Sequence, residues 1–140
     1  MITLDSTPQG YDDYCARTEA IWGNYPNTEE GTEEALKSLL DSKYESNIDD
    51  LELRAFINGH LLGELIKRKV PNAKWLKDFS GLKFSDTKNN TLKFFPQNKL
   101  YKYYTGEDTS DDVIGFYIST IESCKGNNLD KFAKALKKAN

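Results

Sequence analysis

The single histidine of the chain, His60, stands four residues before Glu64. Residues four apart on a helix share a face, so the imidazole and the carboxylate are expected side by side. A base and an orienting carboxylate can support general base catalysis. However, the sequence places no serine, cysteine or second acid that completes a mechanism, and it lacks the second histidine of a zinc-protease motif. We interpret the two residues as a structural pair and predict a protein that is not an enzyme, with no catalytic residues.

A run of carboxylates between Gly106 and Asp112 invites a calcium-binding interpretation. The acids are Glu107, Asp108, Asp111 and Asp112. A calcium loop needs acids at alternate positions, a glycine at its sharp turn and a distant bidentate glutamate. The order here is instead a turn followed by a helix, with Ser110 as the expected N-cap. We therefore predict no metal site and no cofactor.

Lysines are interleaved with aromatic residues from position 93 to position 104, and residues 65–104 hold ten bases and two acids. Single-stranded nucleic acid can stack on such a surface. The alternative is an ordinary sheet and helix whose aromatic side chains point inward, and the sequence signatures of the common RNA-binding modules are absent. We favour this alternative, so nucleic acid is not the expected partner. A nucleic-acid-binding or regulatory module that uses residues 93–104 remains the second functional hypothesis.

Acidic residues are concentrated in the first half of the chain. The formal net charge is −3, but residues 1–64 hold 14 acids and 4 bases, whereas residues 65–140 hold 8 acids and 15 bases. If the helices of the first half pack side by side, their acids form one negative field, which steers a basic partner and raises its association rate. We predict a protein partner that binds at Asp12, Asp13, Glu29, Glu30, Glu33, Glu34, Asp49, Asp50 and Glu52.

The elements that position these residues follow from hydrophobic periodicity. We expect N-terminal helices at about 8–22, 29–44 and 47–68, an antiparallel meander at 74–79, 81–85 and 91–96, and C-terminal helices at about 98–104, 110–121 and 128–138. The third helix is apolar on several sides and is therefore expected at the centre. Gly59 and Gly63 lie one turn apart within it, and each costs up to ~1 kcal/mol relative to alanine. We expect another element to approach the helix closely there.

The meander is expected to turn its apolar residues inward and its lysines outward, with Pro96 closing the last strand. The inward residues are predicted to be Trp75 or Leu76, Leu82, Phe84, Leu92 and Phe94. The fold class is therefore α+β: N-terminal helices, a central three-stranded antiparallel sheet in a single layer packed on helices, and C-terminal helices. A length of 140 residues fits one domain, residues 1–140.

No feature of the sequence indicates secretion or a membrane span. The first residues lack the basic and apolar regions of a secretory signal. The longest apolar run, Val113 to Ile118, is far shorter than the ~20 residues that span a bilayer. Cys15 and Cys124 lie far apart and are expected to be buried thiols rather than a disulfide. We expect a soluble cytoplasmic protein with no membrane partner.

Part of the sequence resembles a loose pattern found in small bacterial α+β proteins. It comprises residues 58–64 (NGHLLGE) at the end of a helix, a strand with Trp75, a hairpin closing in Phe95-Pro96, a short helix ending at Gly106, and Phe116-Tyr117 in a late helix. The helix often reads GAYLGE in that pattern, and this chain departs from it at Asn58 and His60.

Some proteins with this pattern look like immunity proteins, which bind and neutralise a toxin in contact-dependent competition between bacteria. The resemblance implies a non-enzymatic toxin inhibitor whose partner is a toxin domain, and it implies no catalytic residues. The acidic half of the chain adds the expectation that the surface of this domain is basic.

Overall fold

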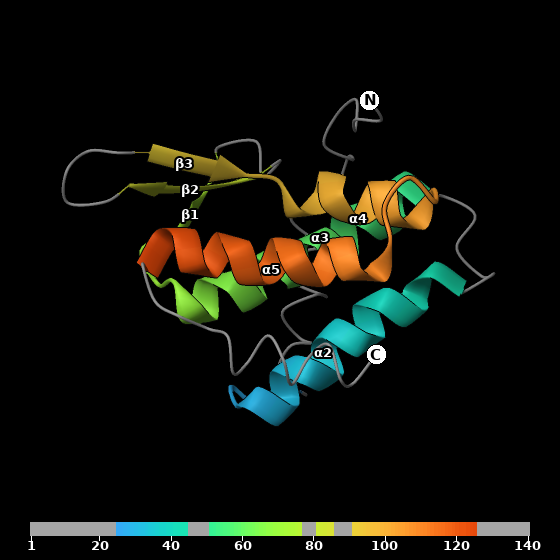
Figure 1. Cartoon of the computed structure of the whole chain (residues 1–140), viewed down its shortest axis with the longest axis horizontal. Coiled ribbons are helices and arrows are strands. Elements are labelled where there is room, and N and C mark those ends of the chain that lie inside the picture. The colour runs from blue at the N-terminus through green and yellow to red at the C-terminus, as the bar shows by residue number, and fades with distance from the viewer. Residues whose placement is uncertain (1–24, 45–50, 77–80, 86–90, 126–140) are drawn as a thin grey trace.

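The computed structural model describes residues 25–44, 51–76, 81–85 and 91–125. Its elements are α2 (Glu29–Asp41), the 3₁₀ helix η1 (Ser42–Tyr44), α3 (Leu51–Lys69), β1 (Lys74–Trp75), β2 (Leu82–Ser85), β3 (Thr91–Phe94), α4 (Pro96–Tyr104) and α5 (Ser110–Lys125) (Figure 1). The predicted α+β class is confirmed. The helices predicted at 8–22 and 128–138 and the loop at 86–90 lie outside the described residues.

Helix α3 lies at the centre of the fold and contacts α2, α4 and α5 (Figure 1). It buries residues on more than one side, among them Ala55, Phe56, Leu62 and Ile66. The helix ends at Lys69, just before Val70-Pro71, because the residue before a proline avoids the α-helical conformation. The predicted central position of this helix is confirmed.

Two glycines of α3 allow its neighbours to approach closely, as predicted. A β-carbon at Gly59 would overlap the backbone of Gln97, whose nitrogen lies 2.7 Å from that position. A β-carbon at Gly63 would overlap the indole of Trp75, whose Cζ2 lies at 2.6 Å. The first turn of α4 therefore rests on Gly59, and β1 rests on Gly63.

The three strands form an antiparallel sheet in the order β1-β2-β3, as predicted. Leu82 pairs with Phe94, and both are buried. Leu92, predicted to point into the core, is 36% exposed, so that prediction is wrong. Leu92 stands next to the loop end of the hairpin, whereas Phe94 lies at the end that leads into α4 and meets the helices.

Pro96 begins α4 instead of closing the last strand, which corrects the sequence-based expectation. Proline suits the first position of a helix because that position needs no backbone N–H donor. Gly106, with φ of +90°, follows the end of α4 as predicted, and its backbone N–H donates to the carbonyl of Tyr103 at 3.1 Å. Of the helices in the described ranges, none is long and apolar enough to cross a membrane.

Candidate functional site

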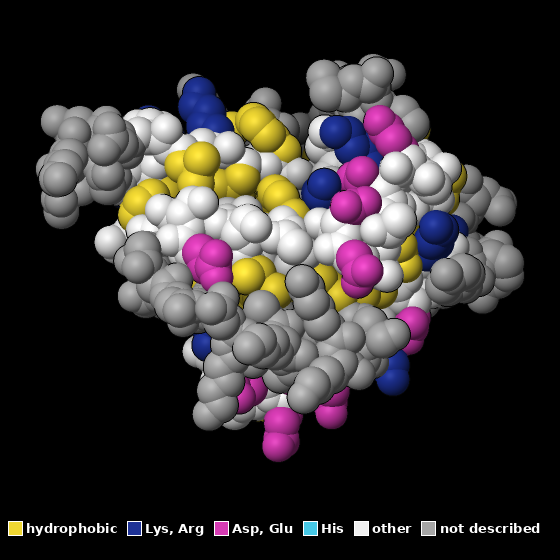
Figure 2. All heavy atoms as spheres, in the orientation of Figure 1, with side chains coloured by type: hydrophobic (Ala, Val, Ile, Leu, Met, Phe, Trp, Pro, Cys, Tyr) yellow, Lys and Arg dark blue, Asp and Glu magenta, His cyan; other side chains and the backbone are white. Residues whose placement is uncertain are grey.

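The first two turns of α2 carry the acidic half-helix, which we define as Glu29, Glu30, Glu33 and Glu34. Thr28 caps this helix, since its Oγ1 accepts a hydrogen bond from the backbone N–H of Gly31 at 3.0 Å. Glu33 is half-buried and the other three glutamates are exposed. Figure 2 shows acidic side chains along the lower edge of the molecule, where α2 lies.

The carboxylates of the acidic half-helix repel one another only weakly and have no basic partner within the described residues. Glutamates four apart repel one another by roughly 0.2–0.5 kcal/mol a pair, and the helix N-terminus offsets this by a similar amount. Among the described residues, no basic side chain forms an ion pair with any of the four carboxylates. Within the described part of the chain, the four charges are therefore not neutralised by an ion pair.

The direction of α3 separates Glu52 from the acidic half-helix. Arg68, in the last turn of α3, donates to the carbonyl of Tyr25 at 2.9 Å, just before α2 begins. Arg54, in the first turn of α3, donates to the carbonyl of Ser42 at 3.1 Å, just after α2 ends. The two helices therefore run antiparallel, and Glu52 lies at the opposite end of α2.

Glu34, the last of the four, lies roughly 10 Å of helix before the end of α2, and Glu29 lies roughly 18 Å before it. Both distances exceed the screening distance of ~8 Å at physiological salt. The structure thus does not join Glu52 to the four glutamates, although the sequence-based prediction grouped them. Asp12, Asp13, Asp49 and Asp50 lie outside the described residues. Of the predicted partner-binding residues that the structure describes, those of the acidic half-helix lie together, and their role in binding stays a prediction.

Two tyrosines of α4 fix the end of α2, a role that the sequence did not indicate. The Tyr103 hydroxyl donates to the Leu40 carbonyl at 3.0 Å, and the Tyr104 hydroxyl donates to the Leu39 carbonyl at 2.8 Å. Both tyrosines are buried. They donate to carbonyls in the last turn of α2, where a helix runs out of its own backbone donors. The Leu40 carbonyl also accepts from the backbone N–H of Ser42, the C-cap of the helix. The helix that carries the acidic residues is therefore tied firmly to the body of the protein.

The aromatic residues between 93 and 104 differ in burial, and Tyr101 is half-buried. Phe94, Tyr103 and Tyr104 are buried, in agreement with the favoured interpretation of an ordinary sheet and helix. Phe95 differs from them, because 43% of its surface is exposed. Tyr103 and Tyr104 cannot stack on nucleic acid while they occupy the core.

His60 and Glu64 share a face of α3, but they do not form a hydrogen bond with each other. His60 Nε2 lies 3.9 Å from Glu64 Oε1. That oxygen instead accepts a hydrogen bond from the indole Nε1 of Trp75 at 2.9 Å. The imidazole stacks on the same indole, with 4.8 Å between ring centroids, and only 3% of the histidine is exposed. This packing supports the interpretation of a structural pair that fixes β1 on α3.

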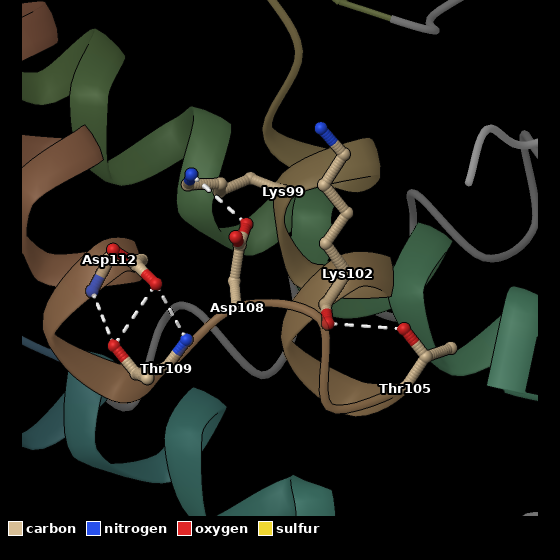
Figure 3. A network of polar contacts seen from close by, with 6 residues as sticks. All are labelled: Lys99, Lys102, Thr105, Asp108, Thr109 and Asp112. Atoms are coloured by element: carbon tan, nitrogen blue, oxygen red, sulfur yellow. Dashed lines mark hydrogen bonds and ion pairs between the residues drawn. The ribbon is translucent and has the colours of Figure 1, made fainter. Parts of the chain in front are cut away.

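Two of the four carboxylates between residues 107 and 112, those of Asp108 and Asp112, make contacts around the turn that leads into α5 (Figure 3). Asp112 Oδ2 accepts from the backbone N–H of Thr109 at 2.8 Å, and the backbone N–H of Asp112 donates to Thr109 Oγ1 at 3.3 Å. These reciprocal bonds make Thr109 the cap, one residue before the predicted Ser110. The backbone hydrogen bond from Thr109 holds the pKa of Asp112 below its ordinary value. Asp108 Oδ2 pairs with Lys99 Nζ at 3.1 Å.

The described ranges contain no group of three or more histidine, cysteine, aspartate or glutamate residues that could hold a metal ion. Cys124, expected to be buried, is only half-buried, and this partial burial raises the pKa of its thiol. Cys15 lies outside the described residues.

Comparisons with models of known families, with curated proteins and with solved structures found no match. Most of the described residues that carry the resemblance to immunity proteins lie inside the scaffold. Gly59, His60 and Gly63 pack against α4 and β1, and Tyr117 is fully buried. Asn58 donates to the Tyr104 hydroxyl at 2.9 Å. These residues hold the scaffold together, so the resemblance concerns the fold more than a binding surface.

Proposed function

We propose that this protein is a non-enzymatic inhibitor of the immunity type, which binds a basic surface on a toxin domain through the acidic half-helix. The observation that carries the proposal is the set of four carboxylates on the first two turns of α2, which the described bases leave without an ion pair. The resemblance over residues 58–64, 75, 95–96, 106 and 116–117 supports the choice of an immunity role. A cytoplasmic location belongs to the same proposal.

A negative surface on a fixed helix suits rapid capture of a basic partner. Complementary charge raises association rates well above those of neutral pairs, and salt reduces this gain. If the toxin domain is a nuclease, its cationic groups normally contact phosphates. The acidic half-helix would then compete with nucleic acid for the same groups.

Binding to a toxin domain tests the proposal. If the neighbouring reading frame encodes a large protein with a variable C-terminal domain, that domain is the probe. We expect the wild-type chain to capture this domain, with association that slows as salt rises. Glu30→Gln with Glu34→Gln should slow association by about tenfold at low salt. Glu107→Gln with Asp111→Asn removes the same charge from exposed positions outside α2 and should leave the association rate within about twofold.

Two results would count against the proposal. Absence of a complex with the wild-type chain would reject the immunity role with this partner. A complex that forms equally fast with both double variants would retain a binding function but would reject the acidic half-helix as its site.

A further inference from the structure

The register of the sheet places three lysines in one row. Lys74 pairs with Lys83 across β1 and β2, and Lys83 pairs with Lys93 across β2 and β3. Side chains of directly opposed residues point to the same face, and their β-carbons lie roughly 5 Å apart. All three lysines are exposed. One face of the sheet therefore carries three adjacent positive charges.

Polar and aromatic groups continue this face. Ser85 pairs with Thr91, their hydroxyl oxygens lie 3.4 Å apart, and both residues are exposed. Phe95 follows Lys93 by two residues and therefore points to the same side. Its ring covers Gly81, where a β-carbon would lie 2.6 Å from Phe95 Cδ1. We call Lys74, Lys83, Lys93, Ser85, Thr91 and Phe95 the lysine face.

The lysine face is electrostatically unfavourable in the free protein. Like charges directly opposite each other in a sheet are destabilising. The three strands contain no acidic residue, and none of the three lysines forms an ion pair within the described residues. A bound anion would relieve this repulsion. The opposite face of the sheet supplies Leu82 and Phe94 to the core, so the lysine face is not needed for packing.

We infer that the lysine face binds single-stranded nucleic acid, with the lysines on successive phosphates and Phe95 stacked on a base. Three cations in a row match a polyanion, and an exposed ring beside them matches the flat face of a base. An acidic peptide would use the lysines but would have no need of an aromatic ring. The inference revises the expectation that nucleic acid is not a partner, and it uses Lys93 and Phe95 without Tyr103 or Tyr104.

This surface is distinct from the acidic half-helix, so the inference does not depend on the proposed inhibitor function. A failure to bind a toxin domain would not bear on nucleic-acid binding by the lysine face. A failure to bind nucleic acid would not bear on toxin binding by the acidic half-helix.

Fluorescence anisotropy with labelled oligo(dT) and oligo(U) tests the contribution of the three lysines to binding. An oligonucleotide of about eight nucleotides lies within the usual site sizes of single-strand binders. Three neutralised phosphates predict a salt slope of about −2, which is an affinity loss of roughly 18-fold between 50 and 200 mM salt. Lys83→Gln with Lys93→Gln should reduce this slope to about −0.7. Lys37→Gln with Lys102→Gln removes equal charge from α2 and α4 and should leave the slope unchanged.

Two substitutions at Phe95 test the ring. Phe95→Leu keeps an apolar side chain but removes the stacking surface, and we expect affinity to fall by about 5- to 150-fold. Phe95→Tyr keeps the ring and should bind like the wild type. Thermal melting of each variant establishes that it is folded before it is compared.

Four results would overturn the inference. The first is no change in anisotropy up to about 100 µM protein at low salt, and the second is an equal loss of affinity in the two double lysine variants. The third is an unchanged affinity in Phe95→Leu. The fourth is that polyglutamate displaces the labelled oligonucleotide as effectively as an unlabelled oligonucleotide does. The last result would assign the lysine face to an acidic protein segment instead.

Discussion

Replacement of Tyr104 by phenylalanine removes one hydroxyl that joins three helices. In the wild type this hydroxyl donates to the Leu39 carbonyl of α2 at 2.8 Å and accepts from Asn58 Nδ2 of α3 at 2.9 Å. The ring of Tyr104 is buried, so phenylalanine occupies the same space. The substitution therefore isolates the two hydrogen bonds from the packing of the ring.

The expected cost follows from these two bonds. Each contributes roughly 0.5–1.5 kcal/mol net, so we expect Tyr104→Phe to lower the free energy of unfolding by about 1–3 kcal/mol. For a chain of this size the melting temperature should fall by about 4–12 °C. Tyr103→Phe removes one bond, to the Leu40 carbonyl, and should cost about 0.5–1.5 kcal/mol.

Urea denaturation followed by circular dichroism measures these differences. Tyr101→Phe is the matched control, because Tyr101 lies in the same helix, is half-buried, and makes no hydrogen bond through its hydroxyl within the described residues. It should change stability by less than about 0.5 kcal/mol. If Tyr104→Phe is no less stable than Tyr101→Phe, the hydroxyl does not hold α2 to the body of the protein, and our account of how α2 is anchored is wrong.

Substitutions of glycine, lysine and aspartate test three other features of the fold. Gly59→Ala should lower the free energy of unfolding by about 1–3 kcal/mol, because the new β-carbon meets the backbone of Gln97. Gly115→Ala has open space around it and should raise the free energy of unfolding by up to ~1 kcal/mol. Melting temperatures that shift in the same direction in the two variants would contradict this. Lys83→Gln removes the repulsion between Lys83 and the lysines opposite it, so the free energy of unfolding should rise by about 0.2–1 kcal/mol at low salt. Salt screens such repulsion, so a rise of the same size in 1 M salt would exclude charge repulsion as its cause. The folded-state pKa of Asp112 lies below its ordinary value of 3.8. Its carboxylate should therefore contribute fully to folding stability above pH 3.8, and this contribution should be lost as the pH falls through the folded-state pKa. The difference in melting temperature between the wild type and Asp112→Asn should therefore shrink below pH 3.8, and a constant difference would refute the capping role.

Features that depend on local periodicity could be predicted from the sequence. The apolar residues of 51–69 recur on several sides of one helix, which indicated the central position of α3. Gly59 and Gly63 indicated close approach because glycine within a helix is costly. The end of α4 followed from Gly106 for a similarly local reason.

Features that depend on how elements meet could not be predicted in this way. Alternation placed Lys83 and Lys93 outward, but their pairing in one row depends on the register of the hairpin. The separation of Glu52 from Glu34 depends on the antiparallel course of α2 and α3. Leu92 fits an inward pattern and is nevertheless exposed, because the pattern does not report where the helices end.

The hydrogen bonds from Tyr103 and Tyr104 also bear on the order of events during synthesis. Their acceptors, the Leu40 and Leu39 carbonyls, precede them in the chain by 63 and 65 residues. At about 5–20 residues per second, α2 leaves the ribosome roughly 3–13 s before α4. During this interval the last turn of α2 lacks both side-chain donors, so the attachment of α2 to α4 can form only after the ribosome has translated past residue 104.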